Sequence, residues 1–371
     1  MLRHMRDRIG FGIIGSGTIA WLHGKVISGL PCAQLIGVAD AVPERAEKLR
    51  AEFGAREAYG DHSRLLARED VDVVCVCTPS GLHAQIGVEA ARAGKHVVTE
   101  KPIDVSLEKA DWLIDTCRVE GVKLACIFQR RTSPLWQLVK RTVDEGRIGR
   151  MVLGSAYLKY SRTQDYYDAS GWRGTWALDG GGALMNQGIH MVDMLQWIMG
   201  PVSTVTAFWD HLVHRIEVDD TTCASLRFAS GALGTIEATT SLAAGLDHRL
   251  EFHGQLGTIR VEGERIIEWS VPGQDVEWAR SVASVSGDSM SPDPKSISPR
   301  GHEIQLADMA AAIRDNRDPM IGGAEARKSL ELVLAIYESG RCGRSISLDN
   351  APSADSADAA VGFDLRFAQM K

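Results

Sequence analysis

The stretch that decides the fold is RIGFGIIGSGTIAWLHGKVI, residues 8–27. Its short apolar run, residues 9–14, predicts a strand, and the following turn carries the pattern G-x-G-x-x-A at Gly15, Gly17 and Ala20. In dinucleotide-binding units the first glycine permits a tight turn, the second lets backbone approach a pyrophosphate, and the small third residue lets helix pack on strand. The helix N-terminus also offers free N–H groups to phosphates. Alone, the pattern is equally compatible with an ordinary tight turn.

The next predicted strand, AQLIGVAD, supplies the context that favours a nucleotide site. It ends in Asp40, twenty residues after Ala20, where an acid accepts hydrogen bonds from an adenosine ribose. A carboxylate there repels a 2′-phosphate, Ala41 offers no phosphate ligand, and Arg45 falls on a solvated helical face. We therefore expect NAD rather than NADP, held at this end by Gly15, Ser16, Gly17, Thr18, Ile19 and Asp40.

Residues 71–102, VDVVCVCTPSGLHAQIGVEAARAGKHVVTEKP, repeat the order strand, turn, helix, strand. The run 71–77 is almost entirely apolar, as in a parallel strand buried on both faces. Ligands of open α/β sheets bind at the carboxyl ends of the strands. His83 opens the helix, where a capping or surface role is the alternative to cofactor binding. Residues predicted to lie on this ligand rim are Thr78, Pro79, Ser80, His83, Glu100, Lys101 and Gln129.

The pattern changes in the second half of the chain. From about Met151 onward, alternating strands separated by glycine-containing hairpins predict a large, mostly antiparallel sheet, and residues 325–339 form an amphipathic helix. Residues 281–300 are typical of a surface loop, and 363–371 of an edge strand. We expect an α/β protein with a Rossmann NAD-binding domain over residues 1–129 and a substrate-binding and oligomerisation domain over 130–371.

Residues 171–200, GWRGTWALDGGGALMNQGIHMVDMLQWIMG, stand apart. A helix after the three glycines would place Asn186, His190 and Asp193 on one stripe, at i, i+4 and i+7. A histidine on such a helix is more often structural than catalytic, but the glycine-rich entry lets a ligand approach. A metal site would need a third ligand, and none is evident, so we expect no metal.

Composition excludes several classes of protein. The chain has 371 residues and a net charge of -7, so it lacks the basic face of a nucleic-acid binder. No apolar run approaches the roughly 18 residues that a membrane span requires. The seven cysteines are scattered, without a CxxC pair, which favours a reducing, cytoplasmic setting.

Together, the fingerprint, TEKP at 99–102, GGGALMNQGIH at 180–190 and the late EARKSLELVLAIYESGR resemble the glucose–fructose oxidoreductase, inositol dehydrogenase and MocA (Gfo/Idh/MocA) family. The resemblance runs from about Ile9 to Leu348. It implies a nicotinamide cofactor between a Rossmann domain and an open-sheet domain, oxidation or reduction of a sugar or polyol hydroxyl or carbonyl, and a homodimer or homotetramer built through the sheet.

The resemblance also assigns roles. The family's EKP lysine is Lys101 and its helix histidine is His190, but the aspartate that inositol dehydrogenases carry four residues earlier is Asn186. MNQGIH and RTQDYYDASGWRGTW instead look like the branch that oxidises nucleotide-linked N-acetylglucosaminuronic acid. An aldose or inositol dehydrogenase remains the alternative. The resemblance thus makes Lys101, Asn186 and His190 catalytic, and the substrate set Lys101, Arg162, Tyr166, Asn186 and His190.

The chemistry of these residue types agrees with an alcohol dehydrogenase. His190 can accept the hydroxyl proton near neutral pH, Lys101 can hydrogen-bond a developing alkoxide, and Asn186 can orient the imidazole. Desolvation could lower the pKa of Lys101 and make it the acceptor instead. Trp172 and Arg173 are predicted to cover the cofactor, with a strand-edge packing pair as the alternative. Pro102 permits a cis bond after Lys101. An NAD-binding sensor without turnover is the rival from another class.

Overall fold

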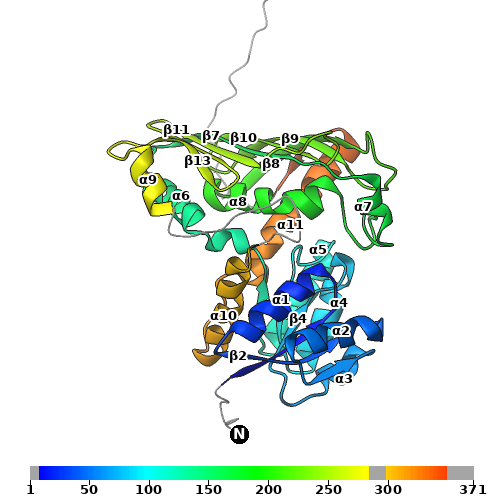
Figure 1. The fold of residues 1–371 in the computed structure, drawn as a ribbon. Coiled ribbons are helices and arrows are strands. Elements are labelled where there is room, and N and C mark those ends of the chain that lie inside the picture. The colour runs from blue at the N-terminus through cyan, green and yellow to red at the C-terminus, as the bar shows by residue number, and fades with distance from the viewer. Residues whose placement is uncertain (1–7, 284–297, 349–371) are drawn as a thin grey trace, which may run out of the picture.

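The computed structural model describes residues 8–283 and 298–348, which form two packed halves around two sheets (Figure 1). The N-terminal half holds a six-stranded parallel sheet in the order β3-β2-β1-β4-β5-β6. Its strands are β1 (Ile9–Ile14), β2 (Ala33–Ala39), β3 (Glu57–Tyr59), β4 (Val73–Val76), β5 (His96–Thr99) and β6 (Leu124–Cys126). The order reverses between β1 and β4, and such a reversal is where open α/β sheets bind ligands.

Helices cover both faces of this sheet. They are α1 (Thr18–Gly29), α2 (Pro43–Phe53), α3 (His62–Leu66), α4 (His83–Arg92) and α5 (Leu107–Val119), with short turns η1 (Ser80–Leu82) and η2 (Gln129–Thr132). A helix from the far end of the sequence, α10 (Arg300–Arg314), packs beside α1. Its Leu306, Met309 and Ala310 join the apolar cluster beneath β1 and β2, so the chain returns to complete this half.

The C-terminal half holds an eight-stranded sheet in the order β13-β12-β11-β7-β10-β9-β8-β14. All neighbours are antiparallel except the parallel pair β7 and β10. The strands are β7 (Met151–Lys159), β8 (Val202–Asp210), β9 (Thr221–Phe228), β10 (Leu233–Thr239), β11 (Arg249–Gly254), β12 (Thr258–Glu262), β13 (Arg265–Ser270) and β14 (Ile346–Ser347). Buried and accessible residues alternate along β9 and β10, as in a sheet covered on one face.

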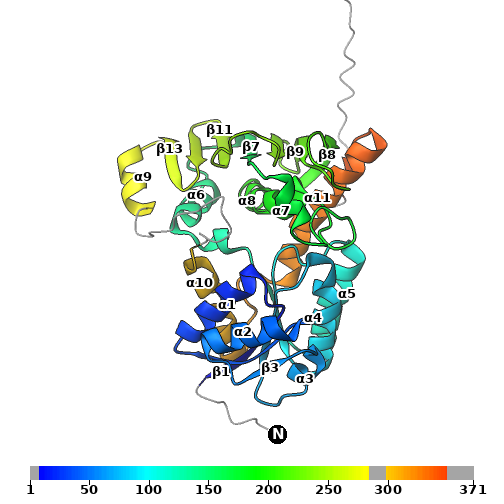
Figure 2. The same cartoon turned by 45° about the vertical axis from the view of Figure 1, so that its right-hand side comes forward.

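Helices of this half lie on the sheet face that looks toward the N-terminal half (Figures 1 and 2). They are α6 (Pro134–Asp144), α7 (Gln164–Asp168), α8 (Ile189–Met199), α9 (Val276–Ala283) and α11 (Gly323–Cys342), with a π-helical turn η3 (Ala183–Gly188) before α8. α11 packs on β8 and α8, and Leu330, Val333 and Tyr337 are buried there. Among the described residues no helix covers the opposite face.

The predicted α/β class, the parallel NAD-type sheet and the mostly antiparallel second sheet are confirmed. The loop predicted over 281–300 is shorter where it can be checked, because residues up to Ala283 belong to α9 and Arg300 begins α10. The remainder of that segment, and the edge strand predicted over 363–371, lie outside the described residues. In the described residues, no helix combines the length and the apolar character that crossing a bilayer demands.

Candidate active site

Lys101 lies where β5 ends, on the edge of the parallel sheet that faces the second half. The peptide bond between Lys101 and Pro102 is cis, as the sequence suggested. The Lys101 Nζ donates a hydrogen bond of 2.7 Å to the main-chain oxygen of Asn186 in η3. A residue predicted to be catalytic in the first half therefore touches one from the second half, although 85 positions separate them.

The glycines before η3 are there because the backbone packs too closely for any side chain. Gly180 and Gly181 have positive φ angles of 76° and 155°. A Cβ on Gly182 would lie 1.9 Å from the Asp219 main-chain oxygen. The buried Asp219 carboxylate accepts hydrogen bonds from the main-chain N–H groups of Gly182 and Leu184, at 2.7 and 2.9 Å. This anchor fixes the start of the π-helical turn that presents Asn186.

The Asn186 side chain does not have the surroundings predicted for it. Its Nδ2 donates to Asp179 Oδ1 at 2.5 Å, and Asp179 Oδ2 accepts from the Gly174 main-chain N–H at 2.9 Å. Asp179 is 1% exposed, and burial raises its pKa to about 6 despite these hydrogen bonds and nearby Lys101. Asp179 was not among the residues predicted from the sequence. The signal available was its place directly before the three glycines.

His190 follows η3 in the first turn of α8. Its ring stands edge-on to Phe128, with centroids 6.0 Å apart, and its buried Nδ1 has no hydrogen-bond partner among the described residues. Desolvation lowers the pKa of His190 well below its usual value, and the charges of Lys101 and Arg130 lower it further. The imidazole is therefore neutral near pH 7 and can accept a proton. No hydrogen bond joins it to the Asn186 amide in the described residues, contrary to the expected orienting role.

The prediction that Asn186, His190 and Asp193 form one polar stripe on a regular helix is also wrong at Asp193. The π-helical turn shifts Asn186 relative to α8, and Asp193 takes part in packing rather than in the site. Its carboxylate pairs with the buried Arg131 guanidinium at 2.7 and 2.8 Å and accepts a hydrogen bond from Ser329. Asp193 thus ties η2, α8 and α11 together.

The Lys101 ammonium is half-buried between these groups. Desolvation lowers its pKa, while the carboxylates of Glu100 and Asp179 partly offset that effect. A lysine with a lowered pKa can release or share a proton closer to neutral pH than an exposed one. Lys101 and His190 are therefore the two candidate acid–base groups of the site, and their catalytic roles stay a prediction.

The dinucleotide end of the site fits a phosphate-bearing ligand. Gly15 has φ 95°, and a Cβ there would lie 2.5 Å from the Cys77 oxygen, so the tight turn needs glycine. A Cβ on Gly17 would meet nothing within 4 Å, and the first turn of α1, with Thr18 and Ile19, carries no acid. The side-chain oxygens of three predicted cofactor residues are buried without a partner among the described residues: Ser16 Oγ, Thr78 Oγ1 and Gln129 Oε1. Such atoms suit a polar cofactor.

Asp40 lies at the end of β2, where the sequence placed it. Its carboxylate accepts hydrogen bonds from the Ser16 and Val42 main-chain N–H groups at 2.7 and 2.8 Å. These contacts hold the acid beside the fingerprint turn. Arg45 is exposed on α2, as expected. This end of the site fits an unphosphorylated adenosine ribose.

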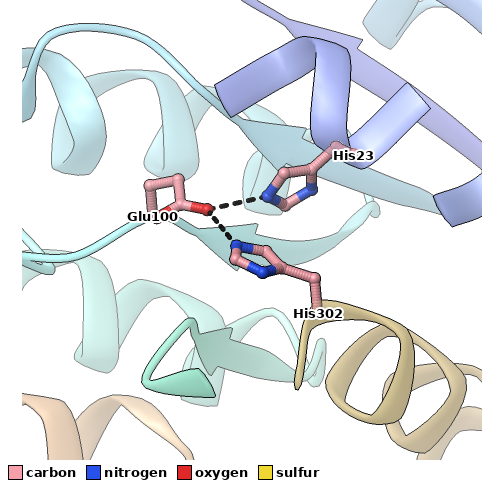
Figure 3. Close-up of side chains that lie close together, drawn as sticks. All are labelled: His23, Glu100 and His302. Carbon is pink, nitrogen blue, oxygen red and sulfur yellow. Dashed lines mark hydrogen bonds and ion pairs between the residues drawn. The ribbon is translucent and has the colours of Figure 1, made fainter. Parts of the chain in front are cut away.

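Two of the predicted rim residues turn their side chains inward. The buried His83 lies between the Pro102 oxygen, 2.7 Å from Nδ1, and the Thr78 oxygen, 3.0 Å from Nε2. Glu100 is bound by two imidazoles (Figure 3). Pro79 and Ser80 lead into η1, where the Gly81 N–H donates to the Leu178 oxygen of the second half. His83 joins two strand ends instead of capping α4, and contact of His83, Glu100, Pro79 or Ser80 with a cofactor stays a prediction.

The predicted substrate residues form a second group around Tyr166. Guanidinium carbons of Arg173 and Arg162 lie 4.4 and 5.2 Å from the Tyr166 ring centroid, and the Tyr166 hydroxyl accepts from Gln187 Nε2 at 3.0 Å. Arg173 also lies 5.3 Å from the Trp172 ring. Gln187 follows Asn186 directly, so this cationic cluster connects to the turn that holds Lys101. The predicted cofactor contact of Trp172 and Arg173 stays a prediction.

Two family models match the chain. One, described as an oxidoreductase family with an NAD-binding Rossmann fold, matches residues 9–128, and the other, the GFO/IDH/MocA C-terminal domain, matches 136–260. An inositol 2-dehydrogenase of Rhizobium meliloti is 32% identical over 275 residues, which is 72% of this chain and 79% of that one. The scyllo-inositol 2-dehydrogenase (NAD(+)) of Bacillus subtilis is 26% identical and covers 93% of this chain and 98% of its own length.

Solved structures agree with these matches. The WlbA dehydrogenase from Bordetella pertussis, in complex with NADH and UDP-GlcNAcA, is 36% identical with a TM-score of 0.85, covering 93% of this chain and 99% of that one. WlbA from Chromobacterium violaceum, with the same two ligands, is 33% identical with a TM-score of 0.84, covering 92% and 96%. The chain therefore belongs to the Gfo/Idh/MocA family of oxidoreductases, with an NAD-binding Rossmann fold.

Proposed function

We propose that this protein transfers a hydride between NAD and a secondary hydroxyl or ketone of a sugar, and that the sugar is acidic and linked to a nucleotide. The observation that carries the substrate class is the pair of guanidinium groups near the Tyr166 ring: those of Arg162 and Arg173 lie 5.2 and 4.4 Å from its centroid. A uronate and a diphosphate are anions that such cations bind. The 36% identity to a protein crystallised with NADH and UDP-GlcNAcA supports the same class.

The residues of the site divide the work of alcohol oxidation. Bound NAD would supply the hydride acceptor. The neutral His190 ring takes the hydroxyl proton, and Lys101 Nζ donates a hydrogen bond to the oxygen on which negative charge develops. The hydrogen bond from Lys101 to the Asn186 oxygen holds the ammonium toward His190's helix before substrate arrives. Because desolvation lowers the pKa of Lys101, this residue can take the proton where His190 does not.

A polyol such as inositol is the second candidate substrate. The 32% identity to an inositol 2-dehydrogenase favours it. Against it, Asn186 replaces the aspartate of the inositol branch, and an uncharged polyol carries no anionic group for a guanidinium to bind. A catalytically inactive NAD-binding sensor is the third candidate. Against it, a sensor would need no acid–base groups, whereas the pKa values of Lys101 and His190 are both lowered.

One experiment separates the three candidates. The purified protein is incubated with NAD and, in turn, UDP-GlcNAcA, UDP-GlcNAc, myo-inositol and glucose, while NADH absorbance is followed. We expect NADH only with the acidic nucleotide sugar, and a marked loss of kcat/KM in Arg173→Ala with that substrate. NADH with inositol but not with the nucleotide sugar would overturn the substrate class. Binding of NAD with neither NADH formation from any of these substrates nor NADH consumption in the reverse direction would indicate a sensor.

The uncovered face of the eight-stranded sheet suggests how copies of the chain assemble. Phe208 on β8 is 77% exposed there, and Leu153 on β7 and Leu233 on the adjacent strand β10 are also exposed. We infer a homodimer or homotetramer formed through this face, which sedimentation velocity would test. Phe208→Glu should shift the distribution toward monomer. All seven cysteines are free, which supports a reducing, cytoplasmic location.

A further inference from the structure

Three buried side chains from distant parts of the chain meet at Glu100, the residue before Lys101 (Figure 3). His23 comes from α1, Glu100 from the residue after β5, and His302 from α10. Glu100 Oε1 lies 2.8 Å from His23 Nε2 and 3.2 Å from His302 Nε2. Both imidazoles are completely buried and Glu100 is 6% exposed. The cluster therefore joins the helix of the dinucleotide fingerprint, the strand that carries Lys101 and the returning helix α10.

The hydrogen-bond pattern places a proton on one nitrogen of each imidazole in this cluster. A carboxylate oxygen only accepts, so each Nε2 carries a proton. Burial alone would lower the pKa of His23, but Cys75 and Glu100 raise it to about 10. Burial would raise the pKa of Glu100, but the two imidazoles hold it well below its usual value. Burial lowers the pKa of His302, which stays neutral. These shifts favour an ion pair between His23 and Glu100 beside a neutral His302.

The Glu100 carboxylate also contacts the main chain of Lys101. Its second oxygen, Oε2, accepts a hydrogen bond from the Lys101 main-chain N–H at 3.4 Å. The Glu100 main chain is held as well, because its N–H donates to the Val76 oxygen at 3.2 Å and its oxygen lies 3.7 Å from Cys126 Sγ, a thiol donor. The carboxylate is also a negative charge next to the Lys101 ammonium.

We propose that His23 and His302 are positioning residues of the active site, which hold the Glu100 carboxylate and through it the main chain and the charge surroundings of Lys101. This proposal rests on the catalytic role proposed above for Lys101. It assigns the two histidines no contact with substrate. The titratable and charged groups that face Lys101 are Glu100, Cys126, Arg130, Asp179 and His190. Of the negative charges among them, that of Glu100 does most to offset the lowering of the Lys101 pKa by burial.

The same three residues are a set that can bind a transition metal, since two imidazoles and a carboxylate converge within 4.8 Å. A metal would require unprotonated nitrogens. Here both nitrogens lie at hydrogen-bond distance from one oxygen, and the raised pKa of His23 favours its protonated form. The geometry therefore favours a hydrogen-bonded cluster, and metal binding becomes an outcome of the test.

The test compares Glu100→Gln, His302→Gln and His302→Leu with the wild type, using the substrate that gives NADH above. The matched control is His62→Gln, because His62 pairs with Glu89 at 2.6 Å on a partly exposed surface of the same domain. We expect kcat to fall roughly tenfold or more in Glu100→Gln and His302→Leu, with recovery in His302→Gln, whose amide can still donate. The Kd for NAD, measured by fluorescence, should change less than kcat. His62→Gln should leave both unchanged.

The pH profile separates positioning from mere folding. Removing the Glu100 charge lowers the pKa of Lys101, so the limb of the kcat profile that reports Lys101 should move to lower pH in Glu100→Gln and stay in place in His62→Gln. In the wild type, one buried imidazole should remain cationic at pH 8 by nitrogen-15 NMR, a measurement that needs no variant.

Four results would overturn the proposal. They are a Glu100→Gln protein with wild-type kcat and pH profile, equal activity in His302→Leu and His302→Gln, a wild type with no cationic buried imidazole at pH 8, and a stoichiometric transition metal in the purified protein. Lys101→Ala tests the proposed function separately. If Lys101→Ala keeps full turnover, the catalytic assignment fails, whatever Glu100→Gln does.

Discussion

Two buried acids flank Lys101, one from each half of the molecule, and their surroundings have opposite effects. Glu100 and Asp179 are 6% and 1% exposed. Imidazoles of His23 and His302 donate to Glu100, whereas Asp179 receives only an amide hydrogen bond from Asn186 and a main-chain N–H. The pKa of Glu100 lies well below its usual value, and that of Asp179 is raised to about 6. The charge of the partners, more than burial, decides whether a carboxyl group in this site is ionised.

The two acids also affect stability in opposite directions. Glu100 stabilises the fold above its unfolded pKa of about 4.3, and this contribution is lost as the pH falls through its lower folded value. The contribution of Asp179 is fully present below its unfolded pKa of about 3.9 and is lost as the pH rises through about 6. Glu100 is a permanent anion near neutral pH, whereas Asp179 is the one that can change charge.

The strongest test of the comparison removes the cation between the two acids. We expect Lys101→Ala to cut turnover by roughly 10³, because it removes a proton-transfer group and a donor to the developing alkoxide. The pKa of Asp179 should rise further, since the Lys101 charge lowers it. The measurements are kcat and an infrared or NMR titration of the carboxyl group. Turnover close to the wild-type rate would show that Lys101 is not required, so that neither acid affects catalysis through it.

His190→Ala should have the next largest effect, a loss of roughly 10² in kcat, because the neutral imidazole is the proposed proton acceptor. The residual activity should follow the titration of Lys101 alone. NAD affinity should be retained, which serves as the folding control. Unchanged kcat in this variant would leave Lys101 as the sole acid–base group.

Some residues around the site could be predicted from the sequence and others could not. The fingerprint turn, Asp40 and Lys101 follow from local rules, because tight turns need glycine and parallel strands end on one ligand rim. His23, His302 and Asp179 could not be assigned that way. Glu100 and His302 are 202 positions apart, and no local pattern specifies their contact. The π-helical turn was missed for a similar reason, since its geometry depends on the anchor at Asp219, outside the helix.

Asn186→Asp would add a second carboxylate beside Asp179, the buried acid from the C-terminal half. The new carboxylate would face Asp179 at the position where Nδ2 now lies 2.5 Å from Oδ1, and two carboxylates that close share a proton. Above the pH at which this shared proton leaves, the pair carries one more negative charge than Asp179 alone and should raise the pKa of Lys101, so the limb that reports Lys101 should move to higher pH, with a loss of about tenfold in kcat there. Asn186→Ala, which keeps the main-chain oxygen, is the control. Identical pH profiles in both variants would contradict the contact with Asp179.

Asp179→Asn should reduce turnover less than Asn186→Asp and should change the pH dependence of stability more. The neutral amide cannot titrate, so the loss of stability that the wild type shows between about pH 4 and 6 should disappear. The raised pKa corresponds to at most about 3 kcal/mol over that range. Urea unfolding at pH 4 and pH 7 measures the difference. An unchanged difference between the two pH values would mean that Asp179 is not the titrating group.

A third acid, Asp40, provides the mildest test, because it lies after β2, whereas Lys101 follows β5. Like Asp179, it accepts main-chain N–H hydrogen bonds, from Ser16 and Val42, but it is only partly buried. Its proposed task is to bind the ribose hydroxyls and repel a 2′-phosphate. Asp40→Ala should therefore narrow the preference for NAD over NADP, by roughly tenfold in the ratio of Kd values for one lost charged hydrogen bond. At saturating NAD, kcat and its pH profile should stay as in the wild type. If the pH profile moved as it does in Asn186→Asp, partner charge near Lys101 would no longer explain the difference between Glu100 and Asp179.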